Sequence, residues 1–142
     1  FPGSYEQLEY GYPRNDRYYA ATADDVARIR AELGVPEGAT AVLYAPTHRD
    51  WDTGFGAGGL DPAAFCEAAG ENVVVLLRAH YFYDRREAFG GGGRIIDVTA
   101  HRSAEDVCLA ADALVTDYSS IMFDYANLDR PIVIHADDWE VY

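Results

Sequence analysis

Lysine is entirely absent from this sequence. All 11 basic residues are arginines, and they stand against 24 acidic residues, so the formal net charge is −13. Without lysine the chain has neither a Schiff-base nucleophile nor a Walker-type phosphate loop. The negative charge also disfavours general binding to nucleic acid or to an anionic membrane surface. A small basic pocket for an anionic ligand is still compatible with this composition.

Cysteine and long apolar runs are scarce as well. Cys66 and Cys108 lie in separate predicted helices, which favours two reduced, packed thiols over a disulfide scaffold. No stretch reaches the roughly 20 apolar residues that a membrane-spanning helix needs. The four histidines show no metal-ligand spacing, so we expect no metal and no cofactor. The 142 residues suffice for one domain with its own core.

Apolar runs alternate with helical patterns along most of the chain. Such alternation implies right-handed crossovers and a parallel sheet, and five strands in about 100 residues fit a Rossmann-like, doubly wound α/β domain. The first 20 residues, rich in tyrosine and turn formers, are expected to be a connecting segment, with a loop at 11–16, before a domain over 21–142. The predicted strands are 41–44, 72–77, 94–98, 113–116 and 131–135, and the predicted helices are 22–33, 62–69, 81–89, 103–111 and 119–127.

Cationic and hydroxyl residues follow several of these strands. Arg49 comes after the first strand, Arg78 and His80 come after the second, and Ser119 and Ser120 come after the fourth. In open parallel sheets ligands bind beyond the carboxyl ends of the strands. A helix beginning with serines offers unpaired N–H groups, and arginine adds charge-assisted bonds. The pattern therefore predicts a site for a diphosphate-bearing ligand at this edge.

Each of these residues also has a purely structural interpretation. Ser119 could be only a helix cap, and the arginines could pair with the abundant acids. The glycine-rich stretch at 54–59 does not fit a dinucleotide fingerprint, because it does not directly join a strand to a helix and no acidic residue follows at the required place. The glycines at 90–93 are expected to form a connector. The convergence of the residues at the strand ends is what favours a site.

Four motifs, in this order and spacing, resemble a known family. They are Gly11–Asp16, Leu43–Thr47, Leu77–His80 and Val115–Asp124. Together they resemble the carboxyl-terminal half of the CDP-glycerol glycerophosphotransferases, the teichoic-acid primases and polymerases of bacterial cell-wall synthesis. The Thr-Asp-Tyr-Ser-Ser…Phe-Asp block is the most specific of the four. His48 departs from the pattern, because the family usually has an aromatic residue there.

The resemblance implies one lobe of a two-lobed GT-B-type glycosyltransferase. Glycerol phosphate would move from CDP-glycerol to a teichoic-acid-like polymer with release of CMP. The donor would bind in this lobe, and the acceptor would bind through an amino-terminal lobe that carries the family's Trp-His-Gly motif, which this sequence lacks. Residues 1–20 would then link the two lobes. The whole protein would be cytoplasmic and peripheral at the inner face of the membrane, without membrane insertion or nucleic-acid binding by this domain.

The resemblance also assigns roles to individual residues. Arg49 and His80 are the expected catalytic residues, facing the donor phosphates. Asp124 is expected to accept the ribose hydroxyls, and the backbone near Val98 to meet the cytosine. The full set of expected substrate-binding residues is Thr47, Arg78, Thr116, Asp117, Ser119, Ser120 and Asp124, with no metal ligand.

Two other functions are compatible with the sequence. One is the donor-binding lobe of a glycosyltransferase that uses a different nucleotide sugar. The other is a non-catalytic, flavodoxin-like binding module, although a receiver-type signalling module would need a lysine after a late strand. The sequence does not distinguish glycerol from ribitol phosphate, or a primase from a polymerase.

Overall fold

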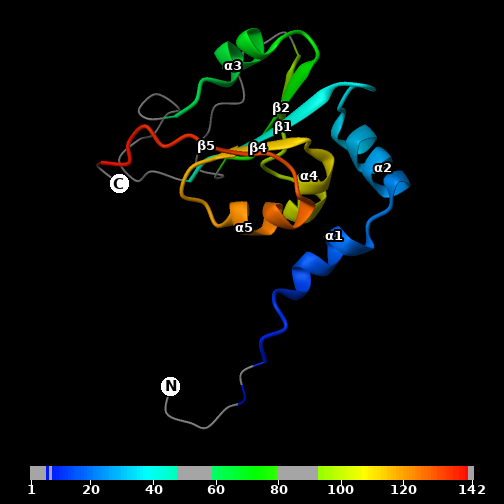
Figure 1. Ribbon diagram of the computed structural model, residues 1–142. Coiled ribbons are helices and arrows are strands. Elements are labelled where there is room, and N and C mark those ends of the chain that lie inside the picture. Colours follow the sequence, from blue (N-terminus) through cyan, green and yellow to red (C-terminus); the bar gives the residue numbers. More distant parts are fainter. Residues whose placement is uncertain (1–5, 7, 48–58, 80–92, 141–142) are drawn as a thin grey trace.

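The core of the fold is a five-stranded parallel sheet with strand order β3-β2-β1-β4-β5 (Figure 1). The computed structural model describes residues 6, 8–47, 59–79 and 93–140. All four strand pairings are parallel, and they confirm the predicted doubly wound α/β class. The strands are β1 Thr40–Ala45, β2 Val73–Leu77, β3 Ile95–Asp97, β4 Ala113–Thr116 and β5 Ile132–Ile134.

The central strands are buried on both faces. Along β1, Leu43 belongs to one apolar cluster and Tyr44 to the other, and Leu76 and Val75 of β2 divide in the same way. Unbroken apolar strands are typical of parallel sheets covered on two sides. Because Ala45 pairs with Thr116, β1 and β4 end at the same level.

Helices lie on both faces of the sheet (Figure 1). Helices α1, α2, α4 and α5 contribute to the cluster under one face, whereas α3 packs against β2 and β3 on the other. No helix in the described part of the chain is long and apolar enough to cross a membrane. The helical elements are η1 Pro13–Asn15, α1 Asp16–Ala20, α2 Ala23–Leu33, α3 Pro62–Ala69, α4 Ala104–Ala110, α5 Ile121–Tyr125 and η2 Ala126–Leu128.

Side-chain caps set the starts of three helices where the sequence predicts them. Thr22 and Asp25 form a reciprocal capping box at α2, and Gly34 ends that helix with φ of 81°. Asp61 accepts from two backbone N–H groups at the start of α3, and Ser103 accepts from one at α4. The prediction of packed, reduced thiols is confirmed too, because both cysteines are buried and free.

Most predicted boundaries agree with the structure to within one residue, and two predicted segments differ more. The 11–16 stretch, predicted as a loop, contains η1, and α1 follows it with Tyr18 only 8% exposed in the core. Composition registers turn-forming residues but not the α4 surface against which this segment packs. The last helix starts at Ile121 rather than Ser119, and Ser120 precedes it without a side-chain cap. The predicted helix at 81–89 lies outside the described residues.

Candidate functional site

A cavity of about 670 Å³ opens at the carboxyl ends of β1, β2 and β4. Strand β1 lies between β2 and β4, so the chain crosses the sheet in opposite directions from this point. Ligands of doubly wound domains bind at such a switch point, and the volume suits a small molecule. The lining residues are Ala45, Pro46, Thr47, Arg78, Ala79, Thr99, Tyr118, Ser119, Ser120 and Ile121.

The loops after β1 and β4 are joined by one carboxylate. Asp117, 4% exposed, accepts from the Thr47 backbone N–H at 2.8 and 2.9 Å through its two oxygens. The Thr47 hydroxyl donates to the same carboxylate at 2.7 Å, and the Tyr118 N–H does so at 2.6 Å. Thr47 and Tyr118 line the cavity, whereas Asp117 does not. The carboxylate therefore lies behind the cavity wall.

Two serines contribute polar groups to the next part of the wall. Ser119 and Ser120 both line the cavity, and Ser120 is exposed. The Ser119 Oγ accepts weakly from the Ile121 N–H at 3.4 Å. Among the described residues, the backbone N–H groups of Ser119 and Ser120 have no hydrogen-bond partner. Unsatisfied N–H donors beside hydroxyl groups suit an anionic ligand.

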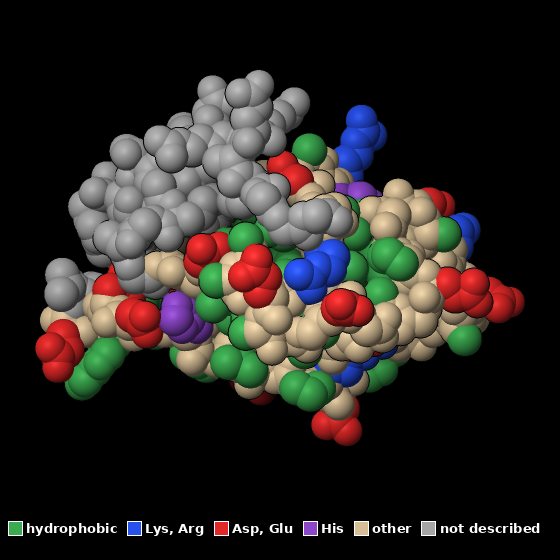
Figure 2. All heavy atoms as spheres, turned by 90° about the horizontal axis from the view of Figure 1, so that it is seen from above, with side chains coloured by type: hydrophobic (Ala, Val, Ile, Leu, Met, Phe, Trp, Pro, Cys, Tyr) green, Lys and Arg blue, Asp and Glu red, His purple; other side chains and the backbone are tan. Residues whose placement is uncertain are grey.

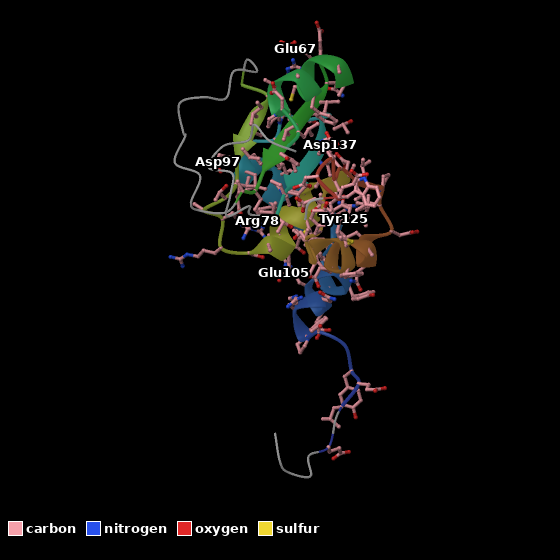
Figure 3. The ribbon with its side chains drawn as sticks, turned by 90° about the vertical axis from the view of Figure 1, so that its left-hand side faces the viewer. Glu67, Arg78, Asp97, Glu105, Tyr125 and Asp137 are labelled. Carbon is pink, nitrogen blue, oxygen red and sulfur yellow. The ribbon has the colours of Figure 1, made fainter. Side chains whose placement is uncertain are left out.

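Arg78 is partly used within the fold. Its Nη1 donates to the carbonyls of Val98 at 3.1 Å and His101 at 3.0 Å, which anchors the segment between β3 and α4. Thr99 in that segment accepts from the Ala79 N–H at 3.1 Å. Figure 3 shows Arg78 near the middle of the molecule. Because both bonds use one nitrogen, the other guanidinium N–H groups remain available to a ligand.

Like Asp117, two further expected ligand contacts have partners within the fold. Thr116 is fully buried and donates its hydroxyl to the Ala45 carbonyl at 2.7 Å. Asp124 pairs with Arg14, whose Nη2 lies 3.0 Å from Oδ2. Neither Thr116 nor Asp124 lines the cavity. Both belong to the motif that supplies the lining residues 118–121, but the sequence does not show which way a side chain points.

The two expected catalytic residues, Arg49 and His80, lie outside the described residues. Their described neighbours in the sequence bear on the prediction. Thr47, two positions before Arg49, and Ala79, directly before His80, both line the cavity. The catalytic assignments of Arg49 and His80 therefore stay predictions.

Sequence reasoning gave no site role to two lining residues with polar side chains. Thr99 lies two positions after the end of β3, and Tyr118 lies between Asp117 and Ser119 inside the most specific motif. Both residues lie two positions after the end of a strand, and this position is the signal that could have identified them. The hydroxyl of Tyr118 donates to Asp138 at 3.2 Å, which links the cavity wall to the chain after β5.

The described part of the site carries few charged side chains. Of the described basic residues, Arg78 alone lines the cavity. Within the described ranges, no group of three or more histidine, cysteine or acidic side chains is placed to hold a metal ion. Figure 2 shows acidic side chains spread over one face of the molecule, with arginines at fewer points. Binding of an anion here would depend on local N–H and hydroxyl donors more than on an extended positive surface.

Known proteins are similar to this chain in sequence and in fold. The teichoic acid glycerol-phosphate transferase of Staphylococcus aureus is 36% identical over 95% of the chain, and the teichoic acid poly(glycerol phosphate) polymerase of Bacillus subtilis is 34% identical over 95%. The chain spans 36% and 19% of the lengths of these two relatives. A structure of the wall teichoic acid polymerase TagF, a variant soaked with CDPG, matches with a TM-score of 0.75 and 35% identity, over 89% of this chain and 31% of that one.

The family model for these enzymes covers the chain from end to end. It matches residues 1–142 and is described as CDP-Glycerol:Poly(glycerophosphate) glycerophosphotransferase. The Rossmann-like lobe that the motifs implied is present, with a cavity where four of the expected binding residues line the wall. The chain therefore belongs to the CDP-glycerol:poly(glycerophosphate) glycerophosphotransferase family.

Proposed function

We propose that this chain forms the donor-binding lobe of an enzyme that transfers glycerol phosphate from CDP-glycerol to a teichoic-acid-like polymer and releases CMP. The observation that carries the proposal is the switch-point cavity, lined by Thr47, Arg78, Ser119 and Ser120, in a chain matched throughout by the family model. A TagF structure soaked with CDPG has the same fold over most of this chain, which supports the same class of donor.

The proposed transfer reaction requires little covalent chemistry from this lobe. An acceptor hydroxyl, whose proton passes to a base in the amino-terminal lobe, attacks the β-phosphorus of the donor. A new P–O bond forms, and the bond to the bridging oxygen breaks as CMP leaves. Negative charge develops on the phosphate oxygens and on the bridging oxygen. Donors fixed around those oxygens stabilise the transition state more than the ground state.

The cavity residues divide that work in our proposal. The hydroxyl and N–H groups of Ser119 and Ser120 hold the diphosphate, and the remaining N–H groups of Arg78 add a positive charge. Arg49 and His80 act on the same phosphates, with His80 either a cationic clamp or a proton donor to the leaving CMP. The segment around Val98 and Thr99, one wall of the cavity, faces the base.

The other partners follow from the two-lobe arrangement. The polymer acceptor binds through an amino-terminal lobe, with residues 1–20 as the link between lobes. The full protein acts on the cytoplasmic side as a peripheral protein of the membrane. The net charge of −13 argues that this lobe is not the part that contacts anionic lipid.

Nucleotide competition tests the proposal. Isotope-labelled chain is titrated with CDP-glycerol, CMP, UDP and GDP, and the amide shifts are mapped by NMR. We expect the cytidine ligands to bind more tightly and to move signals at 45–47, 78–79 and 118–121. The proposal would be wrong if the chain showed no preference for cytidine nucleotides, or if the shifted amide signals all came from residues away from the cavity. The chain alone should show no polymerisation, because the acceptor lobe is needed for turnover.

A further inference from the structure

We propose that Asp117 is a positioning residue that sets which backbone donors of the site are open to the donor phosphates. This inference rests on the proposed function and adds a role for a side chain that does not itself line the cavity. Asp117 stands between Thr116, which is buried in the sheet, and Tyr118, which lines the cavity.

The Asp117 carboxylate joins two loops by hydrogen bonds, and we call this set of bonds the brace. From the described residues the carboxylate accepts four hydrogen bonds at 2.6 to 2.9 Å, three from Thr47 and one from Tyr118. Thr47 follows β1 and Tyr118 follows β4, so these bonds cross the switch point of the sheet. Bonds to an ionised acceptor are roughly twice as strong as neutral ones, so the brace holds both walls in a fixed position.

The same bonds remove two donors from the site. At the carboxyl edge of a parallel sheet, backbone N–H groups are the usual partners of phosphate. Here the N–H groups of Thr47 and Tyr118 both donate to Asp117 instead. The N–H groups of Ser119 and Ser120 have no partner among the described residues. Asp117 therefore directs the diphosphate toward the two serines.

The brace also explains how an acidic residue is tolerated beside an anionic ligand. A buried, unsatisfied carboxylate would be costly and would repel phosphate. At 4% exposure, with both oxygens accepting, Asp117 turns its charge toward its own donors rather than the cavity. Replacing one oxygen by an amide NH₂ would set two donors against each other at the Thr47 N–H.

The test compares Asp117→Asn with Asp129→Asn, an exposed aspartate after η2 that is not part of the cavity wall. CDP-glycerol binding to this chain is measured by calorimetry, and folding by thermal unfolding. We expect Asp117→Asn to weaken binding by roughly tenfold, as the loss of a charged hydrogen bond implies. Asp129→Asn should bind as the unmodified chain does. Equal affinities of the unmodified chain and folded Asp117→Asn would overturn the inference.

A second pair of variants identifies the brace itself. Thr47→Val removes the hydroxyl donor and Thr47→Ser keeps it. If the hydroxyl acts through Asp117, Thr47→Val weakens binding in the unmodified chain but adds little in the Asp117→Asn background. Multiplicative losses in the double variant would contradict the proposal, because they would mean that Thr47 and Asp117 act independently.

Two further readouts separate the possible failures. If the unmodified chain does not bind CDP-glycerol, the proposed function fails before the role of Asp117 is tested. If Asp117→Asn does not fold, Thr47→Val decides through the amide signal of Tyr118. The brace predicts that this signal moves in Thr47→Val and stays in Thr47→Ser, and an unchanged Tyr118 signal in Thr47→Val overturns it.

Discussion

Four of the described arginines, Arg30, Arg78, Arg94 and Arg130, donate to backbone carbonyls. Arg30 donates to the Ala110 carbonyl at 2.8 Å, and Arg130 donates to the Ala111 carbonyl, so the carboxyl end of α4 is capped by two guanidinium groups. Arg78 does the same for the segment before α4. A planar guanidinium with five donors can serve several carbonyls at once, which an ammonium does less well. The arginine-only composition therefore has a structural use beyond ligand binding.

Burial gives Cys108 a measurable effect on alkaline stability. Desolvation raises the pKa of its thiol from 9.0 to about 11. In the unfolded chain the thiol ionises near its ordinary pKa, but in the fold it stays protonated. The stabilisation is thus complete below about pH 9 and is lost as the pH rises through 11. We expect the free energy of unfolding to fall by up to about 3 kcal/mol over this range from this group.

Chemical unfolding at pH 8, 9, 10 and 11 measures this effect, with Cys108→Ala as the comparison. The variant should be less stable at pH 8, because a small cavity remains, but its stability should fall less steeply with pH. Burial also raises the pKa values of Tyr18 and Tyr125, which contribute to the slope in both proteins. Cys108 adds to the rise of both tyrosine pKa values, so Cys108→Ala should reduce their share of the slope as well. Parallel pH profiles of the two proteins would contradict the assignment to Cys108.

Among the elements, η1 and α1 are tied to the helix that follows the cavity. Arg14 lies over the Tyr12 ring at 4.5 Å and makes bonds of 3.0 to 3.3 Å to Asp124 in α5. The Tyr19 hydroxyl donates to Asn127 in η2 at 2.9 Å. An exposed ion pair is weak, but this one is bidentate. We expect a coupling of about 1 kcal/mol in a double-mutant cycle with Arg14→Met and Asp124→Asn.

The same two variants decide between the roles of Asp124. If it serves only the ion pair, Arg14→Met and Asp124→Asn should have equal and small effects on CMP affinity. If it holds the ribose hydroxyls, Asp124→Asn alone should weaken CMP binding strongly. Titration of each variant with CMP gives the answer, and denaturant unfolding gives the coupling energy.

Local patterns in the sequence predicted the elements better than the partners of polar residues. Apolar runs and caps such as Thr22 and Ser103 gave the strands and helix starts, because both depend on nearby residues. The helix at α1 depends on packing against distant α4, and composition does not encode that contact. The predicted strand ends correctly located the cavity. The sequence could not show that Ser119 lines the cavity wall whereas Asp117 lies behind it.

At the scale of the whole molecule, the chain has a net charge of −13, although its site is proposed to bind an anion. Several described arginines pair with acids, among them Arg17 with Asp106 and Arg28 with Glu32. Among the described residues, these pairs leave no extended positive surface to attract a nucleotide. The long-range field should instead repel it, while the donors of the cavity attract it only at close range.

Salt should therefore speed the association of this chain with CDP-glycerol. The screening length falls from about 30 Å at 0.01 M salt to about 8 Å at 0.15 M, which removes the distant repulsion but spares contacts inside the cavity. We expect the association rate, from NMR line shapes of cavity amides, to rise about two- to threefold over this range. Cytidine, which is uncharged, serves as the control and should show no such rise. A steep fall in the CDP-glycerol rate with salt would mean that a positive field, and not the local donors, governs the approach of the ligand.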